Sequence, residues 1–165
     1  MGFESFQVTL GGGRVSHADV DKMLRNVPCM RLDPVPAFTP DSINYLFDDG
    51  HHIVELQLDD SPVCISCRFA LCHPDSIDWA FLDLVRVLME CLGMDATIRE
   101  DVRPEHEHSF PPAEFAAFAS CLPEYIGIRR REWLTAFGPE RMAATTADCW
   151  RRVIHTHCQP TVAQR

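Results

Sequence analysis

The sequence contains a single lysine, Lys22, and no segment that approaches about 18 consecutive apolar residues, which is the apolar length a helix needs to cross a bilayer. Its first ten residues, MGFESFQVTL, include Glu4 and have no basic stretch followed by an apolar one, so they do not match a secretory signal. We therefore expect a cytoplasmic protein with no membrane partner. The many arginines and alanines beside one lysine indicate a GC-rich and hence bacterial genome.

Basic side chains are scarce over most of the chain. The net charge is -9, and up to residue 110 there are nineteen acidic against eight basic side chains. Binding to nucleic acid depends on Lys and Arg that neutralise phosphates, so we expect no nucleic-acid partner. The same excess of carboxylates would attract a basic protein.

Sequence motifs of catalysis and of nucleotide binding are also missing. The chain has no Gly-x-Ser-x-Gly and no His-Glu-x-x-His, the motifs of serine hydrolases and zinc proteases. The run Gly11 to Gly13 lacks both the spaced glycines of a dinucleotide site and the Gly-Lys-Ser/Thr ending of a P-loop. We interpret it as a permissive turn, and we expect neither enzymatic activity nor a cofactor.

Eight cysteines are spread over more than a hundred residues, which does not resemble the disulfide framework of a small secreted domain. Cys64 and Cys67 have the spacing of a zinc knuckle or a redox pair. Their segment has the pattern of a strand, however, and residues three apart in a strand point to opposite faces. We therefore expect this pair to pack and not to hold a metal.

We predict no metal site, but one set of possible ligands is kept as an alternative. Imidazoles and a thiol near the middle and the end of the chain could converge in space on a transition metal. The candidate ligands are His106, His108, His155, His157 and Cys158.

The front of the chain has the pattern of a strand, a glycine turn and a helix. Residues 6–10 alternate apolar and polar side chains, which is the period of a half-buried strand. Ser16, followed by Asp19, is typical of a helix N-cap, and apolar residues continue at helical spacing as far as Val27. A short strand at residues 30–32 and a proline-rich loop at 34–40 are expected next.

The middle of the chain predicts an antiparallel meander. Its strands are expected at residues 43–47, 52–59 and 63–71, with acidic turns between them. A strongly apolar helix follows, opened by Pro74 and Asp75, and it ends at Gly93, a residue type favoured in the left-handed conformation that closes helices. A last strand is expected at residues 96–99.

Residues 103–112, which hold three prolines, are expected to form a loop, and the chain beyond them has helical periodicity interrupted at Pro123 and Gly138. The predicted fold class is therefore α+β: an antiparallel sheet of four to six strands with helices packed on one face, plus a C-terminal helical segment. The predicted division is a sheet domain at residues 1–102 and a helical segment at residues 103–165, packed on the same core.

These patterns together predict a non-catalytic acidic module that binds a basic protein. In composition the chain resembles the immunity proteins that neutralise bacterial toxins, and this resemblance implies an inhibitor whose carboxylates cover a basic site of its partner. The predicted partner-binding residues are Asp48, Asp49, Glu55, Gln57, Asp59, Asp60 and Asp78. Two alternatives remain: a metal-dependent protein or enzyme that uses the His and Cys groups, and an adaptor or homo-oligomer subunit.

Overall fold

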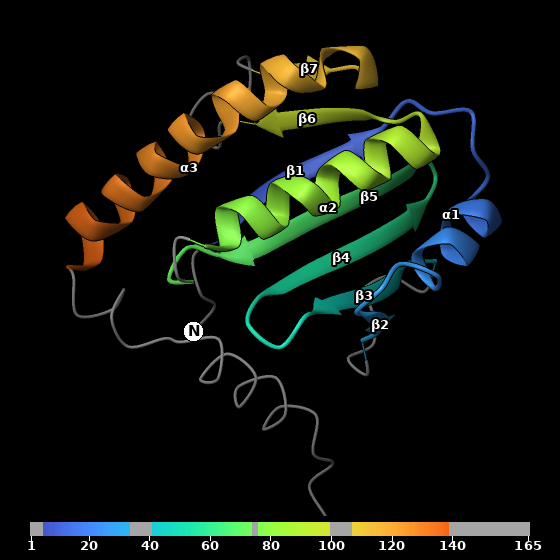
Figure 1. Cartoon of the computed structure of the whole chain (residues 1–165), viewed down its shortest axis with the longest axis horizontal. Helices are drawn as coiled ribbons and strands as arrows, with labels where there is room; N and C mark the ends of the chain where they lie inside the picture. The colour runs from blue at the N-terminus through green and yellow to red at the C-terminus, as the bar shows by residue number, and fades with distance from the viewer. Residues whose placement is uncertain (1–4, 34–40, 74–75, 100–106, 139–165) are drawn as a thin grey trace, which may run out of the picture.

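One antiparallel sheet of seven strands forms the framework of the protein, in the order β2-β3-β4-β5-β1-β6-β7 (Figure 1). The computed structural model describes residues 5–33, 41–73, 76–99 and 107–138. The strands are β1 (Ser5–Gly11), β2 (Met30–Leu32), β3 (Ile43–Asp48), β4 (Ile53–Asp60), β5 (Val63–Ala70), β6 (Asp95–Arg99) and β7 (Glu107–Phe110). The helices are α1 (His17–Leu24), α2 (Ile77–Leu92), the 3-10 turn η1 (Pro112–Glu114) and α3 (Phe115–Phe137). The predicted α+β class is confirmed.

The glycine turn between β1 and α1 is required by close packing. Gly12 has a φ of +76°, which favours glycine. A Cβ atom on Gly13 would lie 2.9 Å from Cγ of Met94 and 3.1 Å from the carbonyl oxygen of Leu92, so a side chain there would collide with the end of α2. Beyond the turn, the Ser16 hydroxyl accepts a hydrogen bond from the Asp19 backbone N–H at 3.2 Å, as expected for an N-cap.

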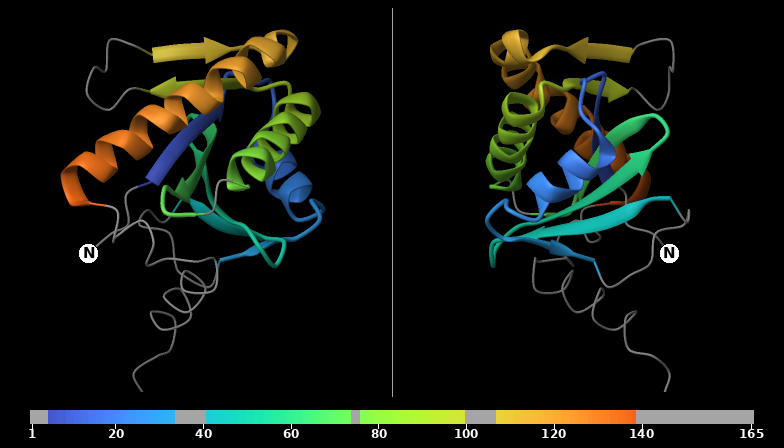
Figure 2. Two further views of the ribbon diagram at one scale, coloured as in Figure 1. Left: turned by 60° about the vertical axis from the view of Figure 1, so that its left-hand side comes forward. Right: turned by 90° about the vertical axis from the view of Figure 1, so that its right-hand side faces the viewer.

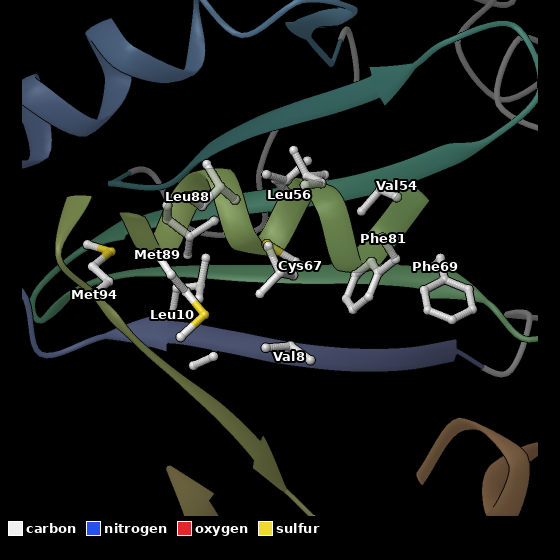
Figure 3. Packing of buried hydrophobic residues seen from close by; sticks show 14 of the residues in the cluster. Val8, Leu10, Val54, Leu56, Cys67, Phe69, Phe81, Leu88, Met89 and Met94 are labelled. Carbon is white, nitrogen blue, oxygen red and sulfur yellow. The ribbon is translucent and has the colours of Figure 1, made fainter. Parts of the chain in front are cut away.

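Helix α2 lies across one face of the sheet and forms the centre of the core. Figure 3 shows Phe81, Leu88 and Met89 of α2 pointing toward side chains of β1, β4 and β5. Seven of its sixteen residues are buried, and the helix ends at Gly93 in the predicted left-handed conformation, with a φ of +62°. Helix α1 packs on the same face beside it (Figure 2), where it contributes Val20 and Leu24 to the same core.

The opposite face of the sheet carries mainly polar side chains, and no described helix packs on it. The register places one uncharged polar residue of each of six strands in a continuous row. The row consists of Asn44, Gln57, Ser66, Thr9, Thr97 and Ser109. Toward one end of this face Leu46 and Ile53 are also buried. The predicted one-sided arrangement of the described helices is therefore confirmed.

The sheet has one more strand than the expected upper limit of six, because residues 107–110, predicted as a loop, form β7 and pair with β6. Phe110 contacts Phe118 of α3, with ring centroids 5.6 Å apart. Strand β7 and helix α3 thus share the sheet and the core with the elements before them.

The predicted interruption at Pro123 does not occur, since α3 continues through it. Phe118, Leu122 and Ile126 are spaced four apart on both sides of the proline and are all buried in the core. A proline inside a helix costs about 3 kcal/mol, whereas burying each such side chain contributes about 1.5–3 kcal/mol. Burial therefore outweighs the proline. Neither α3 nor any other described helix combines the length and the apolar character needed to cross a membrane.

Candidate functional site

The seven predicted partner-binding residues are divided between the two ends of the sheet. Asp48 and Asp49 lie at the β3–β4 turn, and Asp78 lies in the first turn of α2, which begins at that same end (Figure 1). Glu55 and Gln57 lie along β4 on the polar face, and Asp59 and Asp60 lie at the β4–β5 turn. The structure therefore does not bring all seven together on one surface.

Three of these carboxylates pair with arginines of the same chain. Asp48 lies 3.3 Å from Arg31, Glu55 pairs with Arg68 on the neighbouring strand, and Asp78 accepts two hydrogen bonds of 2.8 Å from Arg130. Burial raises the pKa of Glu55, and the charge and hydrogen bond of Arg68 act in the opposite direction. These three carboxylates are therefore already engaged within the fold.

The β4–β5 end of the sheet collects carboxylates that no arginine of the described ranges engages. Here Asp59 lies across from Cys64 on β5, and Gly11 of β1 lies across from Asp95 on β6. We call this group of four carboxylates, Asp41, Asp59, Asp60 and Asp95, the acidic end. Asp41 and Asp60 are exposed, whereas Asp59 and Asp95 are half-buried. Asp59 accepts a hydrogen bond from Gln57 at 2.8 Å, so one further predicted residue, Gln57, reaches this end.

Internal ion pairs do not remove the large negative excess of the described residues up to 110. The described residues up to 110 include fourteen acidic and seven basic side chains, a net charge of -7. An ion pair within the chain rearranges the charge locally and leaves the sum unchanged. A basic molecule that approaches is therefore still attracted, and the acidic end is the place where carboxylates can meet it without first releasing an arginine.

The possible metal ligands are not brought together within the described ranges, where no three His, Cys, Asp or Glu side chains are placed to share an ion. His108 is exposed on β7, and its ring lies 6.0 Å from that of Tyr125. The other candidates, His106, His155, His157 and Cys158, lie outside the described residues.

Cys64 and Cys67 point to opposite faces of β5, as alternation predicts. Cys67 is completely buried in the core, whereas Cys64 lies half-buried on the polar face. Burial raises the pKa of Cys64, and the nearby Asp59 carboxylate raises it further. A raised pKa keeps this thiol protonated and weakly nucleophilic, which is consistent with the expected packing role.

At the other end of the sheet, the β3–β4 turn joins Asp49, His52 and Ser76 in a hydrogen-bonded chain. His52 Nδ1 lies 2.8 Å from Asp49 Oδ2, and His52 Nε2 lies 2.9 Å from the Ser76 hydroxyl. Sequence analysis missed this group because Ser76 is 24 residues from His52 and belongs to no motif. Only the packing of α2 brings its N-cap residue, Ser76, next to the turn.

The second carboxylate oxygen of Asp49 accepts the backbone N–H groups of His51 and His52, at 2.8 and 2.7 Å. Burial alone would raise the pKa of Asp49, but the hydrogen bonds from the His52 ring and from the two backbone N–H groups lower it to about 2. Asp49 is therefore ionised at neutral pH and fixed in position from both of its oxygens.

Comparisons with models of protein families, with curated proteins and with solved structures found no match for this chain. The resemblance to immunity proteins therefore remains one of composition. Function has to be inferred from the charges and the contacts of the residues themselves.

Proposed function

We propose that this protein is a binding module that holds a basic protein at its acidic end, as an inhibitor of that partner would do. The observation that carries the proposal is the gathering of Asp41, Asp59, Asp60 and Asp95 at one end of a sheet whose described residues have a large negative excess. Complementary charge speeds encounter and selects among partners.

The polar face next to the acidic end supports a protein partner. Gln57 and Ser66 lie side by side on β4 and β5, and Thr9 and Thr97 continue the same row on β1 and β6. These side chains are half-buried and carry hydrogen-bonding groups without charge. Such a surface can make polar contacts with a protein that is bound at the acidic end, as the rims of protein interfaces do.

We propose the cytoplasm as the place of action. All six cysteines in the described ranges are free thiols, including Cys29 and Cys91, which are exposed. A reducing compartment keeps exposed thiols in this state, whereas secreted proteins tend to pair them.

The test compares two variants that change the charge equally. The first, Asp59→Asn/Asp60→Asn/Asp95→Asn, removes three of the four charges of the acidic end. The control, Asp83→Asn/Glu90→Gln/Glu124→Gln, also removes three negative charges, but from exposed positions on α2 and α3. Each protein is immobilised and used to capture partners from an extract of the source cells. We expect the wild type and the control to retain the same basic protein at one-to-one stoichiometry, and the first variant to lose it.

Two results would contradict the proposal. One is equal retention of the partner by both variants, because the acidic end would then have no particular role. The other is a captured partner that is itself acidic, because charge complementarity would then be the wrong basis for recognition.

A further inference from the structure

The contacts of His52 define its protonation pattern. Asp49 is ionised and can only accept hydrogen bonds, so His52 Nδ1 must donate to Asp49 Oδ2. In a neutral imidazole the other nitrogen, Nε2, is then an acceptor. The Ser76 hydroxyl, 2.9 Å away, is the donor to it. A serine oxygen thus faces a base whose orientation is set by a carboxylate.

Ser76 is placed so that its oxygen is available for this contact. It is the N-cap residue of α2, yet its side chain makes no capping hydrogen bond. The residue is exposed, whereas the His52 side chain retains only 16% of its accessible surface. The hydroxyl can therefore be reached from solvent, while the base behind it is largely shielded.

We propose that Ser76, His52 and Asp49 act as nucleophile, general base and positioning residue in the transfer of an acyl group from a small carboxylic ester to Ser76 and then to water. The arrangement has the roles and contacts of a Ser-His-Asp triad, which is identified by geometry and not by sequence order. The three residues lie at the opposite end of the sheet from the acidic end, so this inference is independent of the proposed binding function.

The reaction balances with water as the only co-reactant. Ser76 Oγ forms a bond to the acyl carbon while its proton passes to His52 Nε2, and the ester C–O bond breaks as His52 returns that proton to the leaving oxygen. Water then attacks the acyl-serine in the same way, which releases the carboxylic acid and restores the hydroxyl of Ser76. The N–H groups of the first turn of α2, which have no acceptor within the helix, are the nearby donors for the negative charge that develops on the carbonyl oxygen.

The surroundings of Ser76 indicate the class of ester. Trp79 lies one helical turn further along α2 and is 71% exposed, the most exposed of the large apolar side chains among the described residues. An exposed aromatic side chain one helical turn from the nucleophile favours esters with an aryl group. Simple aryl esters such as p-nitrophenyl acetate are therefore suitable substrates for a test.

The experiment uses a fluorophosphonate probe, whose phosphorus atom is attacked by an activated serine with loss of fluoride. The intact protein is labelled, and peptide mass spectrometry locates the adduct, with p-nitrophenyl acetate hydrolysis as a second readout. We expect the adduct on Ser76 and none in Ser76→Ala. His52→Gln and Asp49→Asn should lower the labelling rate by about 100-fold or more, as expected for loss of a general base.

The matched controls are His108→Gln, which changes an exposed histidine on β7, and Ser109→Ala, which removes the exposed serine next to it. Both should be labelled at the wild-type rate. Circular dichroism establishes that each variant is folded. The proposal is overturned if folded wild-type protein forms no adduct on Ser76, or if His52→Gln forms it equally fast. The contact would then only join the turn to the helix.

Discussion

Phe81 is the residue at which helix α2 is anchored to the sheet. Its ring is completely buried, lies 4.9 Å from the ring of Phe69 on β5, and meets Phe6 of β1 edge to face. Such aromatic contacts add to the stabilisation that comes from removing the ring from water. The Phe81 side chain thus contacts both β1 and β5, two strands that are far apart in sequence.

Phe81→Ala should therefore lower the free energy of unfolding by about 3–5 kcal/mol, which is the usual effect of such a cavity. Trp79→Ala is the matched control, because Trp79 is on the same helix but mostly exposed, and it should change stability by no more than about 0.5 kcal/mol. Denaturant unfolding measures both. A similar loss in the two variants would mean that α2 is not packed as described.

Asp49 gives the stability a predictable dependence on pH. Its pKa is lowered in the folded protein from 3.8 to about 2, so its contribution is fully present above the unfolded value and is lost as the pH falls toward 2. In Asp49→Asn the carboxylate contribution is missing at every pH. The difference in unfolding free energy between wild type and variant should therefore be largest above pH 3.8 and should shrink toward pH 2. A difference that stays constant over this range would contradict the hydrogen bonding described for Asp49.

Among the elements, α3 is held to α2 by a forked ion pair. Both terminal nitrogens of Arg130 donate to the Asp78 carboxylate at 2.8 Å, and both side chains are largely buried. The planar guanidinium matches a carboxylate at two points, which a lysine cannot do. The pair therefore fixes the direction of α3 as well as its attachment.

Arg130→Lys should reduce the free energy of unfolding by about 1.5–3 kcal/mol, the range for hydrogen bonds to charged groups, and should speed amide hydrogen exchange in α3. Arg129→Lys is the neighbouring control. Arg129 pairs with Glu132 on the same helix at 3.2 Å, and an ion pair at such a position contributes about 0.3–0.5 kcal/mol. Equal exchange rates in the two variants would show that the fork does not hold α3.

Elements with a strong local pattern could be predicted from the sequence, and those stabilised by distant contacts could not. The alternation in β4 and β5 and the stop at Gly93 are local signals, and they were read correctly. Strand β7 has no such pattern, because only Phe110 among its four residues is apolar. Its pairing with β6 and the packing of α3 make it a strand. The helix break predicted at Pro123 was wrong for a related reason. The burial of residues on either side of the proline outweighs the cost of placing it inside a helix.

For the molecule as a whole, composition could predict the sign of the charge but not its placement. The predicted meander implies that the β3–β4 and β4–β5 turns lie at opposite ends of antiparallel strands, and the fold separates the seven polar residues in this way. The sequence could not show that Arg31, Arg68 and Arg130 would engage Asp48, Glu55 and Asp78. The Asp49, His52 and Ser76 chain was missed because it depends on the same long-range placement.

The negative excess gives the whole molecule one property that binding must reflect. Attraction between net charges acts before contact and is weakened by salt, since the screening length falls from about 10 Å at 0.1 M to about 3 Å at 1 M. Contacts between uncharged side chains respond much less. The dependence of the association rate on salt therefore separates a charge-steered module from one that binds by polar or apolar contacts alone.

The most direct test of the acidic end is the association rate of the captured basic protein, measured by stopped flow at rising salt concentration. We predict that the wild-type rate falls steeply with salt, and that Asp59→Asn/Asp60→Asn/Asp95→Asn associates more slowly, with a weaker salt dependence, than the charge-matched control on α2 and α3. A wild-type rate that is indifferent to salt, or identical rates for the two triple variants, would contradict the account.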